Sequence, residues 1–475
     1  MMPAISTAPA TSASVCRRSL LKATAVLIVL AGFVARPAMA DDHWVASWAT
    51  APGAAFVYVA PLSPDPNSTS PTRFATANIQ PDLRFPFPNA TTTGASAVNQ
   101  TIRSIVKPDL WSDTIRIRLS NAFGTKPVTF NAVTVGLQEY SANIVKGTLT
   151  QVTFNGSKSV TIPVGQQIFS DPVRLRWVKD DDGLLEGRNL ALSYSVQGDS
   201  GPMTYHSGAN QTSFITAQGS GDHTADLDVF AYRFTTSSWF FLNAVDVTAP
   251  RDTVVICAFG DSITDGTHTT FNINDRWMNT LSRRLHNAYG KKVSIVNEAI
   301  GGNRVVNPVT PGAASGPAAV DRLDRDVLAL SGLTDVIWLE GINDLGGNHP
   351  TSDIIAGYRD VVTRLHNAGV NVYAGTITSA LGITGVDMGD NGPGRNAGRL
   401  VLNDFIRHSG LFDGVEDFDA ATLDPDTGNM RDVFLPNSQF TQLPWDYLHP
   451  NHAGYNAMGL AVDITPFAQG HGRRR

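Results

Sequence analysis

Cysteine is nearly absent from this chain of 475 residues, which contains only Cys16 and Cys257. Cys16 falls in a segment that we expect to be removed, so the mature chain can form neither an intramolecular disulfide nor a thiolate metal cluster. Charged residues are also few, at 16%, whereas hydrophobic residues make up 42%. This balance is that of a globular protein and argues against a disordered or coiled-coil chain.

Basic residues are outnumbered by acidic ones, 36 against 42, which gives a formal net charge of −6. The first 40 residues contain no acidic residue but four basic ones, Arg17, Arg18, Lys22 and Arg36. The rest of the chain therefore carries four fewer positive charges and a net charge of −10. Because an acidic surface repels nucleic-acid phosphates and anionic membranes, we expect neither as a partner.

The apolar run near the N-terminus is too short for a permanent membrane anchor. It extends from Ala23 to Val34, about half of the roughly 20 residues that a spanning helix needs. Arg17-Arg18 precedes it, and Ala38-Met39-Ala40 supplies the small residues of a cleavage site. We expect an export signal over residues 1–40, with twin-arginine character or, alternatively, a general secretory one. The prediction is a periplasmic or secreted protein.

Length and pattern both indicate two domains. A chain of 475 residues is at least twice a typical domain. Residues 41–250 alternate polar and apolar positions in short runs, such as Thr114–Leu119, that are broken by Gly, Pro, Asn and Asp. This pattern predicts an antiparallel β-sandwich. Further strands are predicted at 128–135, 159–162, 173–177 and 190–196, and a Pro-rich surface loop at 61–88.

From residue 251 to 475, short and fully apolar runs alternate with helical periods. The apolar runs predict strands at 253–259, 293–296, 336–339 and 370–374. The helical periods lie between them, at 276–288, 318–330 and 353–367. Such an alternation predicts an α/β domain with a parallel sheet covered by helices on both faces.

Four short blocks carry the chemistry of the second domain. Gly260-Asp261-Ser262-Ile263-Thr264 follows the first predicted strand, where ligands bind in an open α/β sheet. On its own, this serine is equally well explained as a turn or helix-cap residue. Three more blocks follow in order: 297–303 (NEAIGGN), 341–344 (GIND) and 446–450 (DYLHP). Together they resemble the SGNH (GDSL) hydrolase superfamily, whose motif residues are Ser, Gly, Asn and His, over about Asp252 to Phe467.

The resemblance implies a flavodoxin-like three-layer α/β/α domain and a role for each motif residue. Ser262 is the expected nucleophile, and His449 is the base that takes its proton and later gives it to the leaving alcohol. Asp446 is expected to hold the other ring nitrogen of His449. The expected oxyanion hole consists of the backbone N–H groups of Ser262 and Gly302 and the side-chain amide of Asn343. This chemistry needs no metal and no other cofactor.

Some choices within these blocks stay open. Gly301 is the alternative to Gly302 as an oxyanion donor. His452 is the alternative base, or else a solvated residue at the start of a helix. We interpret Asp261 and Asp344 as hydrogen-bonding groups of their turns rather than proton carriers.

Three features of the first domain have simpler explanations than catalysis. Gly198-Asp199-Ser200-Gly201 is similar to a trypsin-like nucleophile segment but lacks the histidine segment that such enzymes need, so we expect a hairpin turn. The segment Tyr205–Ser207 either belongs to the sandwich or reaches over the neighbouring active site. Five tryptophans are expected in the core rather than on a sugar-binding platform: Trp44, Trp48, Trp111, Trp177 and Trp239.

The functional expectation is an exported serine esterase that acts through an acyl-enzyme. A β-rich domain before the hydrolase domain is similar to the arylesterase-like SGNH subfamily associated with xylan breakdown. That resemblance implies short-chain, acetyl-type esters of carbohydrates or aryl alcohols. A lipolytic acyl hydrolase is the alternative. A hypothesis of another class is a carbohydrate-binding or envelope-associated module with an inactive hydrolase fold, and the four intact blocks argue against it.

Overall fold

The computed structural model describes residues 42–54, 86–87, 94–179, 183–306, 315–381, 392–436 and 446–468. The predicted export signal and nearly all of the predicted Pro-rich loop lie outside these ranges. Residues Ala40 to Arg475 belong to one compact unit. Within this unit the architecture changes between the strand that ends at Ala249 and the strand that begins at Val254, close to the predicted boundary at residue 250.

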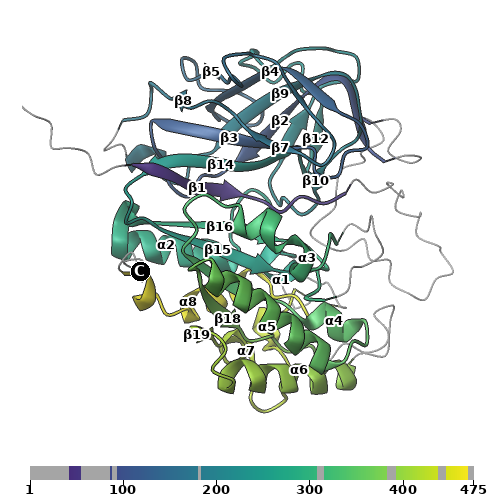
Figure 1. The fold of residues 1–475 in the computed structure, drawn as a ribbon, viewed down its shortest axis with the longest axis vertical. Helices are drawn as coiled ribbons and strands as arrows, with labels where there is room; N and C mark the ends of the chain where they lie inside the picture. Colours follow the sequence, from purple (N-terminus) through teal and green to yellow (C-terminus); the bar gives the residue numbers. More distant parts are fainter. Residues whose placement is uncertain are drawn as a thin grey trace, which may run out of the picture. The chain divides into compact units, whose positions relative to one another are not determined.

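The N-terminal part is built from antiparallel strands, as the alternating runs predict (Figure 1). One sheet has the order β1-β14-β3-β7 with β8 beside β3, a second has the order β12-β11-β2-β9-β4-β5 with β6 beside β4, and β10 pairs with β13. The strands are β1 (His43–Ala49), β2 (Ser96–Val106), β3 (Thr114–Ser120), β4 (Val128–Leu137), β5 (Thr150–Gln151), β6 (Val160–Ile162), β7 (Gln167–Phe169), β8 (Val173–Arg174), β9 (Leu190–Pro202), β10 (Tyr205–His206), β11 (Ser213–Ile215), β12 (Phe234–Thr236), β13 (Trp239–Phe240) and β14 (Leu242–Ala249).

Four of the five tryptophans predicted in the core pack in it or against it, whereas Trp44 is half-buried, with the guanidinium group of Arg116 over its ring. Trp48 and Trp239 are buried and meet edge to face, with ring centroids 4.9 Å apart. Trp111 and Trp177 form a second edge contact at 6.0 Å and pack against the same core. Their indole area therefore stabilises the sheets by burial rather than forming a sugar-binding surface.

The hairpin turn predicted at Gly198–Gly201 is wrong, because this segment lies inside β9. Strand β9 pairs with β2 along its length, and the register shifts near Asp199. Gly198 has φ 72°, and the hydroxyl of Ser200 accepts a 3.0 Å hydrogen bond from the N–H of Ala97. Glycine at positive φ serves bulges as well as turns, so the local pattern did not distinguish the two.

The C-terminal part contains a parallel five-stranded sheet of order β16-β15-β17-β18-β19. Its strands are β15 (Val254–Gly260), β16 (Val293–Ala299), β17 (Asp335–Leu339), β18 (Asn371–Gly375) and β19 (Gly414–Glu416). The helices are α1 (Ser262–Asp265), α2 (Trp277–Tyr289), α3 (Ala319–Arg322), α4 (Ile342–Gly346), α5 (Thr351–Asn367), α6 (Gly392–His408), α7 (Phe418–Thr422) and α8 (His452–Ala461). The predicted helix at 318–330 is α3 continued by a π-helix over Leu323–Leu328. The predicted α/β/α fold is confirmed.

The strand order explains where a site can form. From β15 the chain passes through α2 to β16 at one edge, whereas from β17 it passes through α5 to β18 in the other direction (Figure 1). The direction of the connections reverses between β15 and β17. In an open α/β sheet, the ligand-binding crevice lies at the carboxyl ends of the two strands where this reversal occurs. Ser262 follows β15, Gly302 follows β16 and Asn343 follows β17.

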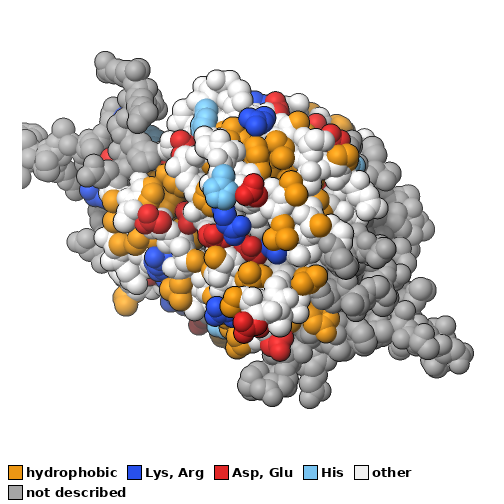
Figure 2. Space-filling view, turned by 90° about the horizontal axis from the view of Figure 1, so that it is seen from below, with side chains coloured by type: hydrophobic (Ala, Val, Ile, Leu, Met, Phe, Trp, Pro, Cys, Tyr) orange, Lys and Arg blue, Asp and Glu red, His pale blue; other side chains and the backbone are white. Residues whose placement is uncertain are grey.

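None of the described helices is long and apolar enough to cross a membrane. In the face that Figure 2 shows, Lys and Arg side chains alternate with Asp and Glu among scattered hydrophobic ones. The described residues of this face thus form no continuous basic patch.

Candidate active site

Ser262 stands at the start of α1, directly after the first parallel strand. A Cβ at Gly260 would collide with the backbone oxygen of Leu339, so glycine lets β15 and β17 run close together here. Asp261 caps α1 by accepting a 3.0 Å hydrogen bond from the N–H of Ile263. The N–H of Ser262 has no acceptor among the described residues and stays available for a ligand.

The structure brings together the three residues predicted as the catalytic triad. Ser262 Oγ lies 2.7 Å from His449 Nε2, and His449 Nδ1 lies 2.7 Å from Asp446 Oδ2. Because Nδ1 faces a carboxylate, it carries the ring proton and Nε2 accepts from the serine hydroxyl. Asp446 Oδ1 also accepts from the backbone N–H groups of Leu448 and His449, both at 2.9 Å. The carboxylate of Asp446 thus orients both the backbone turn at 446–449 and the ring of His449.

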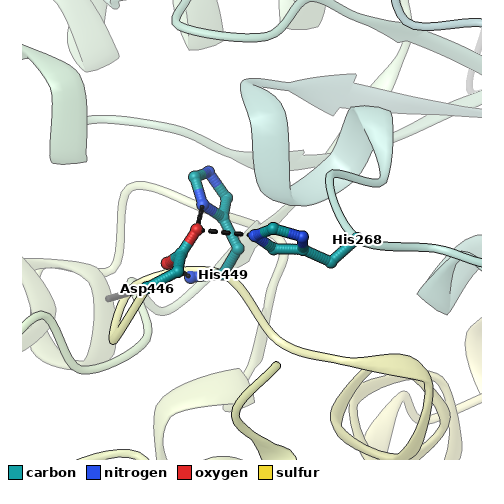
Figure 3. Close-up of side chains that lie close together, drawn as sticks. All are labelled: His268, Asp446 and His449. Carbon is teal, nitrogen blue, oxygen red and sulfur yellow. Dashed lines mark hydrogen bonds and ion pairs between the residues drawn. The ribbon is translucent and has the colours of Figure 1, made fainter. Parts of the chain in front are cut away.

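A second histidine contacts the same carboxylate. His268 Nε2 donates to Asp446 Oδ2 at 2.7 Å, so one oxygen binds two imidazole rings (Figure 3). The side chain of His268 is buried, and its backbone has φ 68°. The sequence analysis missed this residue because it precedes Asp446 by 178 positions and no short spacing links the two.

The contacts among these side chains shift the pKa values of Asp446 and His449 in opposite directions. Burial acts to raise the pKa of Asp446, but the charge of His449 and the hydrogen bonds from both histidines outweigh it and hold the pKa well below its usual range. Burial acts to lower the pKa of His449, but Asp446 outweighs this effect and raises the pKa above its usual value. The carboxylate therefore stays ionised, and the imidazole is a stronger base than a free histidine.

The loop after β16 favours Gly302 over Gly301 as an oxyanion donor. The N–H of Gly301 already donates to Asp265 Oδ2 at 3.0 Å. The N–H of Gly302 has no acceptor among the described residues, and the residue has φ 77°. The side-chain amide of Asn343 donates one hydrogen to the backbone oxygen of Asn303 at 2.9 Å, which leaves its second hydrogen for a ligand.

Asp344 and His452 both lie outside the proton path, although Asp344 bonds the loop after β16 and not, as was predicted, its own turn. Asp344 accepts from the backbone N–H groups of Val305 and Val306 at 2.9 and 3.0 Å, and burial raises its pKa to about 6. His452 begins α8, is largely exposed and pairs with Asp275 at 2.9 Å. Burial likewise raises the pKa of the capping group Asp261 to about 7.

The N-terminal part also reaches this site. His206 of β10 contacts Asp265 Oδ1 through Nε2 at 3.1 Å, and its Nδ1 contacts the backbone oxygen of Ala51 at 3.0 Å. Both the ring of His206 and the carboxylate of Asp265 are buried. Since Asp265 in turn accepts from Gly301, a side chain of the first part supports the loop that carries Gly302. Both alternatives for Tyr205–Ser207 hold in part, because β10 pairs with β13 of the first part while His206 contacts the catalytic part.

The atoms that bind a metal in other proteins also meet here. Ring nitrogens of His268 and His449 and an oxygen of Asp446 lie within 4.8 Å of one another. Both rings, however, direct a nitrogen at the carboxylate oxygen over 2.7 Å (Figure 3), the length of a charge-assisted N–H···O bond. The two bonds to Asp446 thus hold the three groups together as hydrogen-bond partners, while Nδ1 of His268 has no partner among the described residues.

A family model described as the GDSL-like Lipase/Acylhydrolase family matches residues 258–457. The C-terminal half of this chain is a GDSL/SGNH hydrolase domain. This domain is accordingly that of a carboxylic ester hydrolase.

Three solved structures illustrate the similarity of the hydrolase domain, and each covers 44% of this chain. The aryl esterase of M. smegmatis is 16% identical over 95% of its own chain, with a TM-score of 0.34. Est24, a carbohydrate acetylesterase from Sinorhizobium meliloti, is 16% identical over 96%, with a TM-score of 0.33. A member of the lipolytic G-D-S-L family from Veillonella parvula DSM 2008 is 16% identical over 96%, with a TM-score of 0.29. No curated protein matches the chain.

Proposed function

We propose that this protein is an exported serine esterase that removes short acyl groups from carbohydrate or aryl esters through an acyl-enzyme. The observation that carries the proposal is the pair of 2.7 Å contacts that links Ser262 to His449 and His449 to Asp446. A serine hydroxyl is a weak nucleophile at neutral pH and needs such a base beside it.

In the acylation step, Ser262 Oγ attacks the ester carbonyl carbon as His449 Nε2 takes the hydroxyl proton. Asp446 stabilises the imidazolium that forms. Negative charge on the former carbonyl oxygen is bound by the N–H groups of Ser262 and Gly302 and by the amide of Asn343. The tetrahedral intermediate then collapses, and His449 gives its proton to the leaving alcohol.

Deacylation repeats this sequence with water as the nucleophile. His449 Nε2 takes a proton from the water, whose oxygen attacks the acyl carbon. The same three donors bind the second oxyanion, and the proton returns to Ser262 Oγ as the carboxylic acid leaves. A single base thus serves both halves of the cycle, with no cofactor.

Hydrolysis of p-nitrophenyl esters, from acetate to dodecanoate, tests this proposal. The chain starting at Asp41 is assayed beside its Ser262→Ala variant, which serves as the blank. We expect serine-dependent turnover that is fastest for the shortest acyl groups. Fastest turnover of long acyl groups would replace the proposal by a lipolytic one, and no serine-dependent turnover of any ester would favour an inactive binding module.

Export is tested separately, on the full chain. Expression in a bacterium, followed by N-terminal sequencing of the protein from the periplasm and medium, should find a new terminus at Asp41. Substitution of Lys for both Arg17 and Arg18 should reduce export if the twin-arginine route is used. Full-length protein retained in the cytoplasm would contradict the proposal.

A further inference from the structure

Arg395 of α6 has a buried guanidinium group whose hydrogen-bonding capacity is only partly used by the described residues. The residue is 5% exposed, and its Nε and Nη1 atoms are buried without a hydrogen-bond partner. Arg399, one turn further along α6, shows the usual arrangement, because it bonds Asp419 at 2.5 Å. A buried guanidinium without a partner is costly, so Arg395 requires an explanation beyond packing.

Arg304 places a second guanidinium beside the first. A Cβ at Gly346 would collide with Nη2 of Arg395, and a Cβ at Gly347 would lie 2.9 Å from Nη1 of Arg304. The two cations thus lie against consecutive glycines at the end of α4. Nε of Arg304 is also buried without a partner. Burial and the charge of Arg304 together lower the pKa of Arg395.

The arginine pair adjoins the predicted catalytic groups. The charge of Arg395 is near enough to His449 to lower the pKa of that ring, against the larger effect of Asp446. Arg304 follows Asn303, whose backbone oxygen holds the amide of Asn343. Helix α4 carries Asn343 in its first turn and the two glycines at its end. A ligand between the guanidinium groups would therefore lie close to an ester bound at Ser262.

We propose that Arg395 and Arg304 form an anion-binding subsite, and that the preferred ester carries an anionic group, such as a carboxylate, near its scissile bond. This inference rests on the proposed esterase function and adds the substrate class. Guanidinium groups bind carboxylates through paired N–H donors, and an anion here would supply the partner that Arg395 lacks. The glycines leave space for the two guanidinium groups, since side chains at 346 or 347 would collide with them.

The negative net charge of the protein opposes the binding of anionic substrates, so a preference for them is a clear sign of a local subsite. Without residues 1–40 the chain carries a net charge of −10, and its field repels anionic substrates at long range. A preference for an anionic ester over a neutral one must therefore come from a local site. The anionic group can belong to the acyl part or to the alcohol part of the ester. Each possibility is tested with an anionic ester and a neutral ester that is otherwise the same.

The first experiment compares such pairs with the unmodified chain from Asp41. For the alcohol part, 4-carboxyphenyl acetate is compared with its neutral methyl ester; for the acyl part, mono-p-nitrophenyl adipate is compared with its methyl ester. We expect kcat/KM to be about tenfold or more higher for the anionic member of one pair, the size of a charged hydrogen bond. Added salt should reduce this ratio.

Variants then assign the preference to the arginine pair. Arg395→Gln and Arg304→Gln should each lower the anionic-to-neutral ratio about tenfold, whereas Arg233→Gln, at an exposed position of the N-terminal part, should leave it unchanged. Equal or faster turnover of the neutral member in both pairs would overturn the subsite but leave the esterase proposal standing. No turnover of any of the four esters would overturn both.

Discussion

His268 donates a 2.7 Å hydrogen bond to Asp446, and the accepting oxygen is the one that also holds His449. The backbone of His268 has φ 68°, a strain on the order of 1–3 kcal/mol for such a residue, and its Nδ1 is buried without a partner. Both features cost stability. A role in positioning the carboxylate explains why the ring is nevertheless held there.

Replacement of His268 tests that role. We expect His268→Ala to lower kcat about 10- to 100-fold, and His268→Gln, which keeps an N–H donor, to lower it less. The hydrogen bond from His268 lowers the pKa of Asp446, so its loss makes Asp446 more basic and raises the pKa of His449. The acid limb of the kcat profile should therefore move to higher pH. An unchanged profile in both variants would show that His268 only fills space.

The pH dependence of the unmodified enzyme follows from the same contacts. His449 accepts a proton only when neutral, and Asp446 raises its pKa above the ordinary histidine value, about 6.5. Activity should therefore rise with pH, and kcat/KM should reach half its maximum above about 6.5. The measurement is initial rates on p-nitrophenyl acetate in buffers of constant ionic strength. A half-maximum clearly below 6.5 would contradict the assignment.

Asn343 should act mainly on the transition state. Its free amide hydrogen binds charge that develops on the oxyanion, so Asn343→Ala should lower kcat about 10²- to 10³-fold with little change in KM. Asn287→Ala, on an exposed position of α2, is the matched control and should leave both constants unchanged. If Asn343→Ala instead raises KM at constant kcat, the amide binds the ground state and is not an oxyanion donor.

The contact between His206 and Asp265 predicts that the N-terminal part influences catalysis. In His206→Ala, the carboxylate of Asp265 keeps the bond from the N–H of Gly301 as its one hydrogen bond among the described residues, and the loop that carries Gly302 loses a support. We expect kcat to fall about tenfold, with KM much less affected. The control is His223→Ala, which removes a histidine that pairs with Asp226 in the same part. Equal kcat values for both variants and the unmodified chain would show that His206 contributes to folding stability and not to catalysis.

The sequence alone predicted the elements whose signals are local. Strands β15 and β17 are buried on both faces and therefore consist of continuous apolar runs. Ser262, Asn343 and His449 lie in short blocks next to strand ends or turns. Strand β19, with three residues, is too short to show a pattern, and α6 was not predicted because it begins Gly-Pro-Gly.

Residues that act through distant partners were not predictable in this way. His268 and His206 are single histidines without neighbouring motif residues, and each finds its carboxylate only after folding. Arg395 is one of several arginines in the second domain, and what distinguishes it is burial with two nitrogen atoms that have no hydrogen-bond partner among the described residues. The register of the second block favours Gly302 over Gly301, and the bond from the N–H of Gly301 to Asp265 supports that choice.

The measurement that tests the central claim most directly is capture of the acyl-enzyme. The chain from Asp41 is mixed with excess p-nitrophenyl acetate, quenched in acid within the first turnover, digested and analysed by mass spectrometry, with Ser262→Ala treated in parallel. The account predicts a burst of p-nitrophenol and one acetyl group on Ser262, with neither in the variant. Normal turnover by Ser262→Ala, or acetylation at another residue that accounts for the burst, would contradict it.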